Sequence, residues 1–389
     1  MFFKKILLPV LLLCISSGVY SKGKLLTDEE LKKAKQYKSL KEALKEPDKV
    51  YTLSISKKDF SIFPRELFKL TNLQYLGLVG NDITEIPQEI ERLQNLQKLY
   101  LNSNIIKHVA KEIGNLKHLK ELHFSWNQLH EFPVEITYIT SLETLNISNN
   151  KFDKIPKEIG RLVNLKWFEM RYNRNLKELP GEIGNLKNLI HLRVSGNALE
   201  SLPREIGNLR NLRLLEIADN KINALPKTVG NMEKLKHLLA FKNQLKVLPR
   251  TIGKLKNLEW LYISSNNIAV LPREIGRLEN LKEIQAHTNQ LQYLPKEIGN
   301  LKKLENIMLY RNKLIRLPRE IGDAEKLKEL DLKDNQLQSL PDEMANLKNL
   351  KSINIKKNRF SPKGIEKLKK LLPKVYISCD RELLRKKKK

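Results

Sequence analysis

The sequence predicts an α/β solenoid, a horseshoe with about fifteen short parallel strands on its concave side and short helical or 3-10 turns on its convex side. An asparagine recurs along the chain of 389 residues, at intervals of 23 residues in eleven cases and of 24 residues in one. A leucine-rich stretch precedes each asparagine, and a proline follows it in eleven of the thirteen repeats. A fixed period of roughly 20 to 50 residues indicates stacked units, because one unit alone cannot bury its apolar face.

One repeat shows how the spacing specifies the predicted elements. In the segment Leu261-Tyr262-Ile263, successive side chains point to opposite faces of a strand, so the leucine and the isoleucine face inward and Tyr262 faces the concave surface. Pro272, followed by Arg-Glu-Ile-Gly, predicts a single helical turn. Proline is expected at the first position of this turn and glycine just past its end.

The asparagine is predicted to hold the turn that follows each strand. Its side-chain amide has two N–H donors and one oxygen acceptor, so it can satisfy backbone groups that the stacked turns remove from water. The predicted ladder consists of Asn81, Asn104, Asn127, Asn150, Asn173, Asn197, Asn220, Asn243, Asn266, Asn289, Asn312, Asn335 and Asn358.

The repeated phrase LPxEIGxLxNLxxLxLxxNxL covers roughly residues 50 to 380 and resembles the leucine-rich-repeat family. It is most similar to the 23-residue tandem-repeat proteins that are abundant in pathogenic spirochaetes. The resemblance implies a protein-binding module without enzymatic activity. It also implies that the ligand is a host surface or matrix protein and that the role is adhesion or virulence.

Four segments are expected along the chain. Residues 1–21 have the features of a secretory signal peptide: a pair of lysines, a ten-residue apolar run too short to span a bilayer, and a small residue at the cleavage site. Residues 22–49 predict a helical cap over the first repeat, and residues 50–360 form the predicted solenoid. Residues 361–389 predict a helix, an edge strand and a basic tail. The mature protein is then expected to be secreted, surface-located or periplasmic, without a transmembrane segment.

The ends of the solenoid carry local signals of their own. Thr27-Asp28-Glu29-Glu30 and Ser39-Leu40-Lys41-Glu42 both match a capping box, which starts a helix. Ser361 is predicted to cap the last helix, while Lys58 and Asp380 stand at ladder positions in the first and last repeats.

Two other interpretations of the N-terminal segment remain open. In the first, the protein is a lipoprotein and Cys14 is the site of lipid attachment, although the preceding Leu13 is larger than the residue usually found before such a cysteine. Alternatively, the apolar run belongs to a cytoplasmic protein. If the signal is cleaved before Lys22, Cys379 is left as a single thiol, which excludes a disulfide within the mature chain.

The sequence does not predict catalysis, and no cofactor is expected. It contains no glycine-rich phosphate loop after a strand, no HExxH and no GxSxG. His237 and His287 lie on strands that are two apart, about 10 Å between backbones, and the middle strand offers Trp260 and Tyr262 in place of a third metal ligand. We therefore expect no metal site.

The predicted interaction surface is the concave face. With the asparagine as position zero, the side chains at positions −6, −4, −2 and −1 are expected to face the concavity or its rim, and all three tryptophans occupy these positions. Exposed aromatic side chains gathered on one face mark an interaction site. A central group comprises Leu214, His237, Leu239, Phe241, Trp260, Tyr262, His287, Met308 and Tyr310. A second group, nearer the N-terminus, comprises Tyr100, Trp126, Trp167 and Tyr172.

The formal charge of +28 leaves a second class of function open. Lysine and arginine recur at equivalent loop positions, which predicts an even basic coat and favours a protein partner over nucleic acid on the mixed concave face. The alternative is a polyanion ligand, such as a glycosaminoglycan or acidic lipid, bound by this coat and the C-terminal lysines. A periplasmic scaffold is a third possibility.

Overall fold

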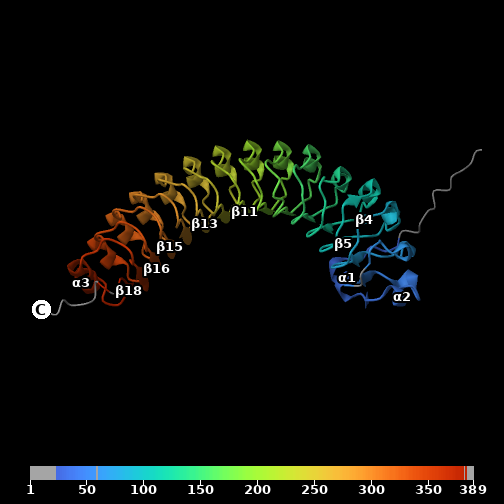
Figure 1. Ribbon diagram of the computed structural model, residues 1–389, viewed down its shortest axis with the longest axis horizontal. Coiled ribbons are helices and arrows are strands. Elements are labelled where there is room, and N and C mark those ends of the chain that lie inside the picture. The colour runs from blue at the N-terminus through green and yellow to red at the C-terminus, as the bar shows by residue number, and fades with distance from the viewer. Residues whose placement is uncertain (1–22, 58–59, 381, 383–389) are drawn as a thin grey trace, which may run out of the picture.

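The computed structural model describes residues 23–57, 60–380 and 382, and it confirms the solenoid. The described chain forms an arch whose inner side is a 16-stranded parallel sheet, with each strand paired to the next one along the chain (Figure 1). The strands are β1 (Gln36–Tyr37), β2 (Thr52–Ser54), β3 (Tyr75–Gly77), β5 (Lys98–Tyr100), β7 (Glu121–His123), β8 (Thr144–Asn146), β9 (Trp167–Glu169), β10 (His191–Arg193), β11 (Leu214–Glu216), β12 (His237–Leu239), β13 (Trp260–Tyr262), β14 (Glu283–Gln285), β15 (Asn306–Met308), β16 (Glu329–Asp331), β17 (Ser352–Asn354) and β18 (Tyr376–Ser378).

The convex side is built from short 3-10 helices, one in each repeat. These are η2 (Arg65–Lys69), η3 (Gln88–Arg92), η4 (Lys111–Asn115), η5 (Val134–Tyr138), η6 (Lys157–Arg161), η7 (Gly181–Asn185), η8 (Arg204–Asn208), η9 (Lys227–Asn231), η10 (Arg250–Lys254), η11 (Arg273–Arg277), η12 (Lys296–Asn300), η13 (Arg319–Asp323) and η14 (Asp342–Asn346). The strands are only two or three residues long and line the inner side of the arch, whereas the 3-10 helices lie on its outer side (Figure 1).

The glycine of the convex turn lies at a different position from the predicted one, and glycine is required there for a different reason. Gly276 lies inside η11 rather than past its end, and Pro272 is the N-cap rather than the first residue of the turn. A Cβ atom on Gly276 would lie 2.4 Å from the carbonyl oxygen of Glu297, in the following turn. The glycine is therefore needed because successive turns approach closely, not because the turn ends in a left-handed conformation.

The inward side chains form one continuous core that runs from Tyr37 to Cys379. Leu261 and Ile263 are fully buried, as their place in the strand predicts, while Tyr262 between them is half-buried on the concave side. Cys379 is a free thiol in this core.

The side-chain amide of each ladder asparagine is tied to the repeat before it. Asn266 accepts a hydrogen bond from the Leu245 N–H (2.9 Å) and donates to the carbonyl oxygens of Ala240 (3.0 Å), Ile263 (3.1 Å) and Ser264 (3.1 Å). The donation to a carbonyl oxygen of the preceding repeat recurs at all thirteen ladder positions. One buried side chain thus satisfies backbone groups from two repeats and sets their spacing.

A second asparagine ladder, which the sequence analysis missed, runs along the connection from the convex turn back to the strand. In the repeat of Asn257, for example, the side chain donates to the Glu233 carbonyl oxygen at 2.8 Å. The same bond to a carbonyl 24 or 25 residues earlier is made by Asn72, Asn95, Asn164, Asn188, Asn211, Asn280 and Asn349. Both loops of the solenoid are therefore pinned by side-chain amides.

Separate elements cover the two ends of the core. Helix α1 (Asp28–Lys33) has the predicted capping box at Thr27, whereas Ser39 before α2 (Leu40–Ala43) makes no side-chain cap. At the other end, Ser361 caps α3 (Pro362–Leu371) by accepting from the Gly364 N–H.

Asp380 does not occupy the predicted ladder position. The register of β17 and β18 aligns it with Lys356, two residues before Asn358, and its carboxylate accepts a hydrogen bond from the Lys357 N–H at 2.9 Å. In other repeats a backbone carbonyl oxygen takes this role, as when the Ser265 N–H donates to His287. The expectations for residues 1–22, for Lys58 and for the tail at 385–389 lie outside the described residues.

A minor sheet lies on one flank of the arch. It pairs β4 (Glu85–Ile86) with β6 (His108–Val109), and it is extended by a bond from the Ala110 N–H to the Ile86 carbonyl oxygen at 3.0 Å. Ala110 stands where most repeats have proline, and proline has no N–H to donate. This departure from the repeat explains why the sheet reaches this far here.

The ladder predicts a sharp contrast between two neighbouring asparagines. Asn266→Leu should destabilise the protein substantially, because each buried backbone group left without a partner costs roughly 1–3 kcal/mol. Asn267→Leu changes an exposed side chain and should alter the free energy of unfolding by less than about 0.5 kcal/mol. Urea denaturation of both variants gives the comparison, and equal midpoints would contradict the role of the ladder.

Candidate functional site

The strand register brings five concave side chains into a single row. Trp167, His191, Leu214, His237 and Trp260 are direct neighbours on β9 to β13. His237 stacks on Trp260 with ring centroids 4.0 Å apart, and Trp167 meets His191 edge-on at 5.8 Å. The two groups predicted from the sequence are therefore connected, and His191, which was not among the predicted site residues, links them.

Leu214 corrects one prediction. It occupies the middle of this row but is only 7% exposed, because the larger residues beside it cover its short side chain. Trp167 and Trp260 are 37% and 38% exposed, so they present the contact area that Leu214 cannot. Leu214 supports the row rather than offering surface to a partner.

Toward the C-terminus, the concave face carries a cluster that we call the aromatic window. Trp260 and Tyr262 lie nearly parallel with centroids 6.1 Å apart, and His287 stacks on Tyr310 at 4.1 Å. The window consists of His237, Leu239, Phe241, Trp260, Tyr262, His287, Met308 and Tyr310, all partly exposed. Three positions on each of β12 to β15 face this side, and of these twelve side chains only Glu283 carries a formal charge.

Partial burial in the window changes the titration of its polar groups. Burial, with the nearby carboxylate of Glu283 as a second cause, raises the pKa of Tyr262 to about 12. Burial also lowers the pKa of His237 and of His287 below the ordinary value of 6.5. At neutral pH the phenol and both imidazoles are thus uncharged, and the window is apolar with a few hydrogen-bonding edges.

The neighbouring strands β9 to β11 carry a network of charges that neutralise one another. Glu169 accepts from Arg193 at 2.9 Å and lies 3.4 Å from Arg171, while Arg193 also lies 3.4 Å from Glu216. The Ser195 hydroxyl donates to Glu216 at 2.9 Å. Two arginines and two glutamates leave no net charge, so this part of the concave face is polar but electrically balanced.

The N-terminal part of the concave face is largely occupied by the protein itself. Tyr100 packs between Tyr75 and His123, with ring centroids 5.3 Å and 4.5 Å away, and its hydroxyl donates to Glu121. Lys98 bridges Glu121 at 2.8 Å and Asp28 of α1 at 2.9 Å. Tyr100 therefore belongs to an internal contact between the cap and the sheet, which leaves it less available than predicted.

Trp126 and Tyr172 occupy a different surface from the rest of their predicted group. Both lie at position −1, where the backbone is left-handed, with φ of 59° and 57°. They project from the rim rather than from a strand, and they are 64% and 47% exposed. The ring of Tyr172 covers Gly196, where a Cβ atom would lie 2.3 Å from the ring. A bulky residue with positive φ is uncommon, but a positive φ recurs before every ladder asparagine, including at Gly80 and Gly196, so the turn of the repeat imposes this geometry.

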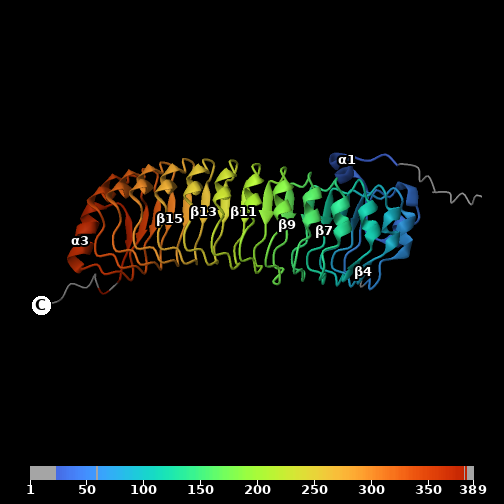
Figure 2. The same cartoon turned by 90° about the horizontal axis from the view of Figure 1, so that it is seen from above.

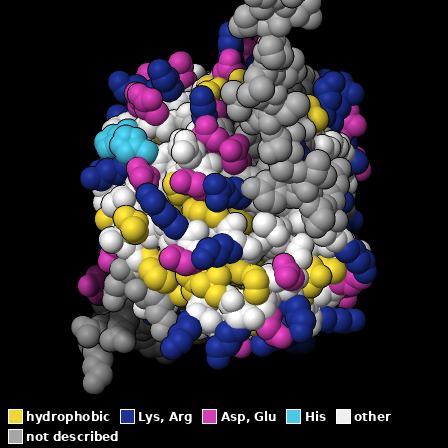
Figure 3. Space-filling model, turned by 90° about the vertical axis from the view of Figure 1, so that its right-hand side faces the viewer, with side chains coloured by type: hydrophobic (Ala, Val, Ile, Leu, Met, Phe, Trp, Pro, Cys, Tyr) yellow, Lys and Arg dark blue, Asp and Glu magenta, His cyan; other side chains and the backbone are white. Residues whose placement is uncertain are grey.

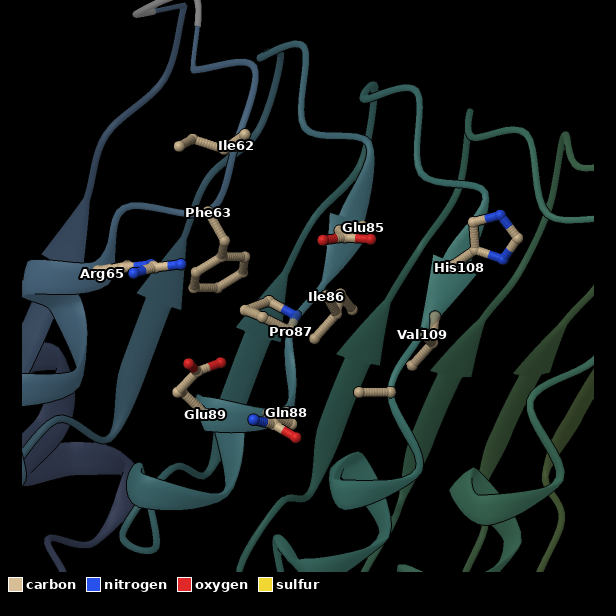
Figure 4. Close-up of a pocket in the computed structure, with 11 residues that line it drawn as sticks. Ile62, Phe63, Arg65, Glu85, Ile86, Pro87, Gln88, Glu89, His108 and Val109 are labelled. Carbon is tan, nitrogen blue, oxygen red and sulfur yellow. The ribbon is translucent and has the colours of Figure 1, made fainter.

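A cavity of about 450 Å³ lies on the flank beside β4, away from the concave face (Figure 4). Its wall combines the apolar side chains of Ile62, Phe63 and Val109 with the carboxylates of Glu85 and Glu89. The N-terminal end of the molecule next to it shows basic and acidic side chains closely intermingled (Figure 3). The repeat pattern does not predict this cavity, because the cavity depends on the irregular first repeat.

The described part of the chain contains neither a cluster of metal ligands nor a helix that could span a membrane. Within it, no three His, Cys, Asp or Glu side chains are grouped so that they could hold a metal ion. No helix among the same residues is long and apolar enough to cross a bilayer.

Comparisons with known families match most of the solenoid. A family model described as "Leucine-rich repeat region" matches residues 49–149 and 181–246. A second model, described as "Leucine rich repeat", matches residues 140–199 and 302–360, and a third model of the same description matches residues 257–278. No curated protein matches the chain.

Solved structures give the same picture. A leucine-rich-repeat protein of Leptospira interrogans is 35% identical, with a TM-score of 0.75, over 88% of this chain and 99% of that one. The ectodomain of the Arabidopsis thaliana receptor kinase GASSHO1/SCHENGEN3, solved in complex with Casparian strip integrity factor 2, is 27% identical with a TM-score of 0.59. That match covers 79% of this chain and 44% of the receptor. An internalin of Listeria monocytogenes is 21% identical (TM-score 0.65, covering 86% and 88%), and this likeness shows the fold alone.

Three partly buried histidines predict that the stability of the fold decreases at mildly acidic pH. Burial is the main cause that lowers the pKa of His123, His237 and His287, so the folded state binds these protons less readily than the unfolded state. Their contribution to stability is complete above the pKa of unfolded histidine, about 6.5, and is lost as the pH falls through the folded values. Thermal unfolding at about pH 7.5 and about pH 5.5 should therefore show a lower Tm at the acidic pH.

A variant that lacks these three histidines provides the control. Replacing the same three histidines by glutamine should reduce the difference in Tm between the two pH values. Glu259 does not interfere, because contacts with Lys282 and Lys236 hold its pKa at about 2, so its contribution is lost only below the pH range tested. An unchanged difference in the variant would show that other groups control the acid response.

Proposed function

The chain belongs to the leucine-rich-repeat family, and we propose that it is an exported, non-enzymatic protein that binds a protein ligand on its concave face. The observation that carries this proposal is the aromatic window on β12 to β15. A chain with a formal charge of +28 keeps this surface almost free of charge, which suits an apolar protein surface better than a polyanion.

The chemistry of the window supports a role as a binding anchor. Trp and Tyr contribute large contact areas and are enriched among the residues that dominate binding energy. The stacking of His237 on Trp260 and of His287 on Tyr310 holds these rings in place before a partner arrives. Pre-ordered side chains lose less conformational entropy on binding, so more of the contact energy contributes to affinity.

The relatives favour the same class of ligand. The plant receptor ectodomain that this chain resembles was solved in complex with a named factor, and the 35% identical protein comes from Leptospira interrogans. We infer that the ligand is a host surface or matrix protein and that the protein acts in adhesion. Export rests on the signal-like composition of residues 1–21.

The test compares adjacent positions on β13. Trp260→Ala and Tyr262→Ala remove concave side chains and should each weaken binding by about 2 kcal/mol or more, about thirtyfold in affinity, while the fold stays intact. The ligand is first isolated with the parent protein from host serum or cell-surface extract, and the Kd of each variant is then measured by calorimetry. Leu261→Ala, which opens a cavity in the core, should instead cost roughly 2–5 kcal/mol of stability.

Two outcomes would contradict the proposal. Full affinity in both aromatic variants, together with lost affinity in Trp126→Ala or Trp167→Ala, would move the site toward the N-terminus. A loss of binding by orders of magnitude as salt rises, with no effect of the aromatic variants, would favour the polyanion alternative.

A further inference from the structure

The flank of the C-terminal half carries an apolar row that the concave site does not use. Ala224, Val247, Val270 and Tyr293 occupy the same position of four successive repeats, four residues after the ladder asparagine. All four side chains are exposed; the exposed fraction is 57% for Val247, 63% for Val270 and 45% for Tyr293. Ile315, 45% exposed, lies beside the end of this row. We call these five residues the flank row.

The loops that carry the flank row are stacked in register. The N–H of Asn267 donates to the Leu245 carbonyl oxygen, and the N–H of Gln290 donates to that of Ile268, both at 2.9 Å. In the N-terminal repeats, the equivalent positions form the paired strands β4 and β6. Neighbouring loops lie about 5 Å apart, so the flank row forms a continuous stripe about 20 Å long.

A column of cations borders the flank row. The residue after the proline is basic in six successive repeats, beginning at Arg204, and we call the last five of these residues the cation column: Lys227, Arg250, Arg273, Lys296 and Arg319. All five are exposed. Two of the arginines touch the glutamate that follows them in the chain, Arg273 to Glu274 at 3.5 Å and Arg319 to Glu320 at 3.4 Å.

The same flank positions are free of acidic residues in this half of the molecule. At positions +1, +3, +4 and +7 after the asparagine, residues 221 to 319 include nine lysines and arginines and no Asp or Glu. The N-terminal repeats have acidic residues in these columns: Asp82, Glu85, Glu131 and Asp153. The combination of the apolar row with flank positions that hold cations and no acidic residue is therefore a local feature, not a consequence of the repeat.

The shape of this flank is suited to a flat surface. The arch lies in one plane, and from above its loops end along a nearly straight edge (Figures 1 and 2). Helix α1 projects at the opposite edge from β4, so it does not obstruct the flank that carries the row (Figure 2). Short aliphatic side chains spread along an edge are poor anchors for a protein partner, where Trp, Tyr and Arg in pockets dominate.

We propose that this flank binds the surface of a bilayer that contains anionic phospholipids. The cation column lies against the negatively charged headgroups, where each lysine or arginine contributes attraction, and the flank row enters the boundary between headgroups and acyl chains. Tyr293 suits this boundary because its ring is apolar and its hydroxyl remains hydrated, and the Arg316 guanidinium lies 5.3 Å from the ring centroid. The concave face then stands perpendicular to the bilayer and stays open to a protein ligand.

Sedimentation with vesicles tests the proposal. The full-length protein should bind vesicles of phosphatidylcholine with phosphatidylserine and should bind vesicles of phosphatidylcholine alone only weakly. The combined variant Arg250→Gln, Arg273→Gln and Lys296→Gln should lower the partition coefficient about tenfold or more. The combined variant Val247→Ser, Val270→Ser and Tyr293→Ser should also lower it about tenfold, because its apolar contact is lost.

A matched variant separates this site from general charge. Lys107→Gln, Lys111→Gln and Lys157→Gln together remove three charges from the same flank in the N-terminal repeats and should leave binding within about twofold of the parent. An equal loss of vesicle binding in this variant, or unchanged vesicle binding in the flank variants, would overturn the proposal. It would also be overturned if the parent protein does not bind vesicles and the flank variants lose only self-association. Trp260→Ala should bind vesicles normally, so this test stands apart from that of the concave site.

Discussion

The hydrogen bonds of the ladder asparagines are the constraint on which the rest of the structure depends. Each strand is only two or three residues long, so the sheet alone offers few bonds to fix one repeat on the next. The amide of Asn266, bonded to Leu245, Ala240 and its own turn, holds the turns at a constant spacing. The close contact of Gly276 with the next turn is possible only at that spacing. The buried leucines fill the space that this frame leaves.

The same constraint separates residues that build the frame from residues that are free to vary. Along β13, Leu261 belongs to the core, whereas Trp260 and Tyr262 on either side can change without altering the stack. One repeat can therefore carry an ion pair and the next an aromatic ring. This freedom allows a neutral charge network on β9 to β11 to lie beside an apolar window on β12 to β15, and a cationic flank to form on the outside.

The sequence predicted what the period determines and missed what depends on individual repeats. The strands, the convex turns and the outward direction of Trp260 follow from spacing alone. The burial of Leu214 depends on the size of its cross-strand neighbours, and the partial cover over Tyr100 depends on the ion pair between Lys98 and Asp28 of α1. These two features need the three-dimensional neighbours, which the repeat does not specify. The left-handed backbone at Trp126, in contrast, recurs at the residue before each ladder asparagine, and Gly80 and Gly196 at this position are the sequence signal for it that was overlooked.

The central claim is that the aromatic window contacts a protein, and site-specific photo-crosslinking tests it most directly. A photoreactive side chain at Gln285, which pairs with Tyr262 in the sheet, is compared with the same group at the exposed Val163 outside the concave face. After irradiation with host serum or cell-surface proteins, the account predicts a protein adduct from position 285 only, lost when Trp260→Ala is added. Equal adducts from both positions, or adducts from position 163 alone, would contradict it.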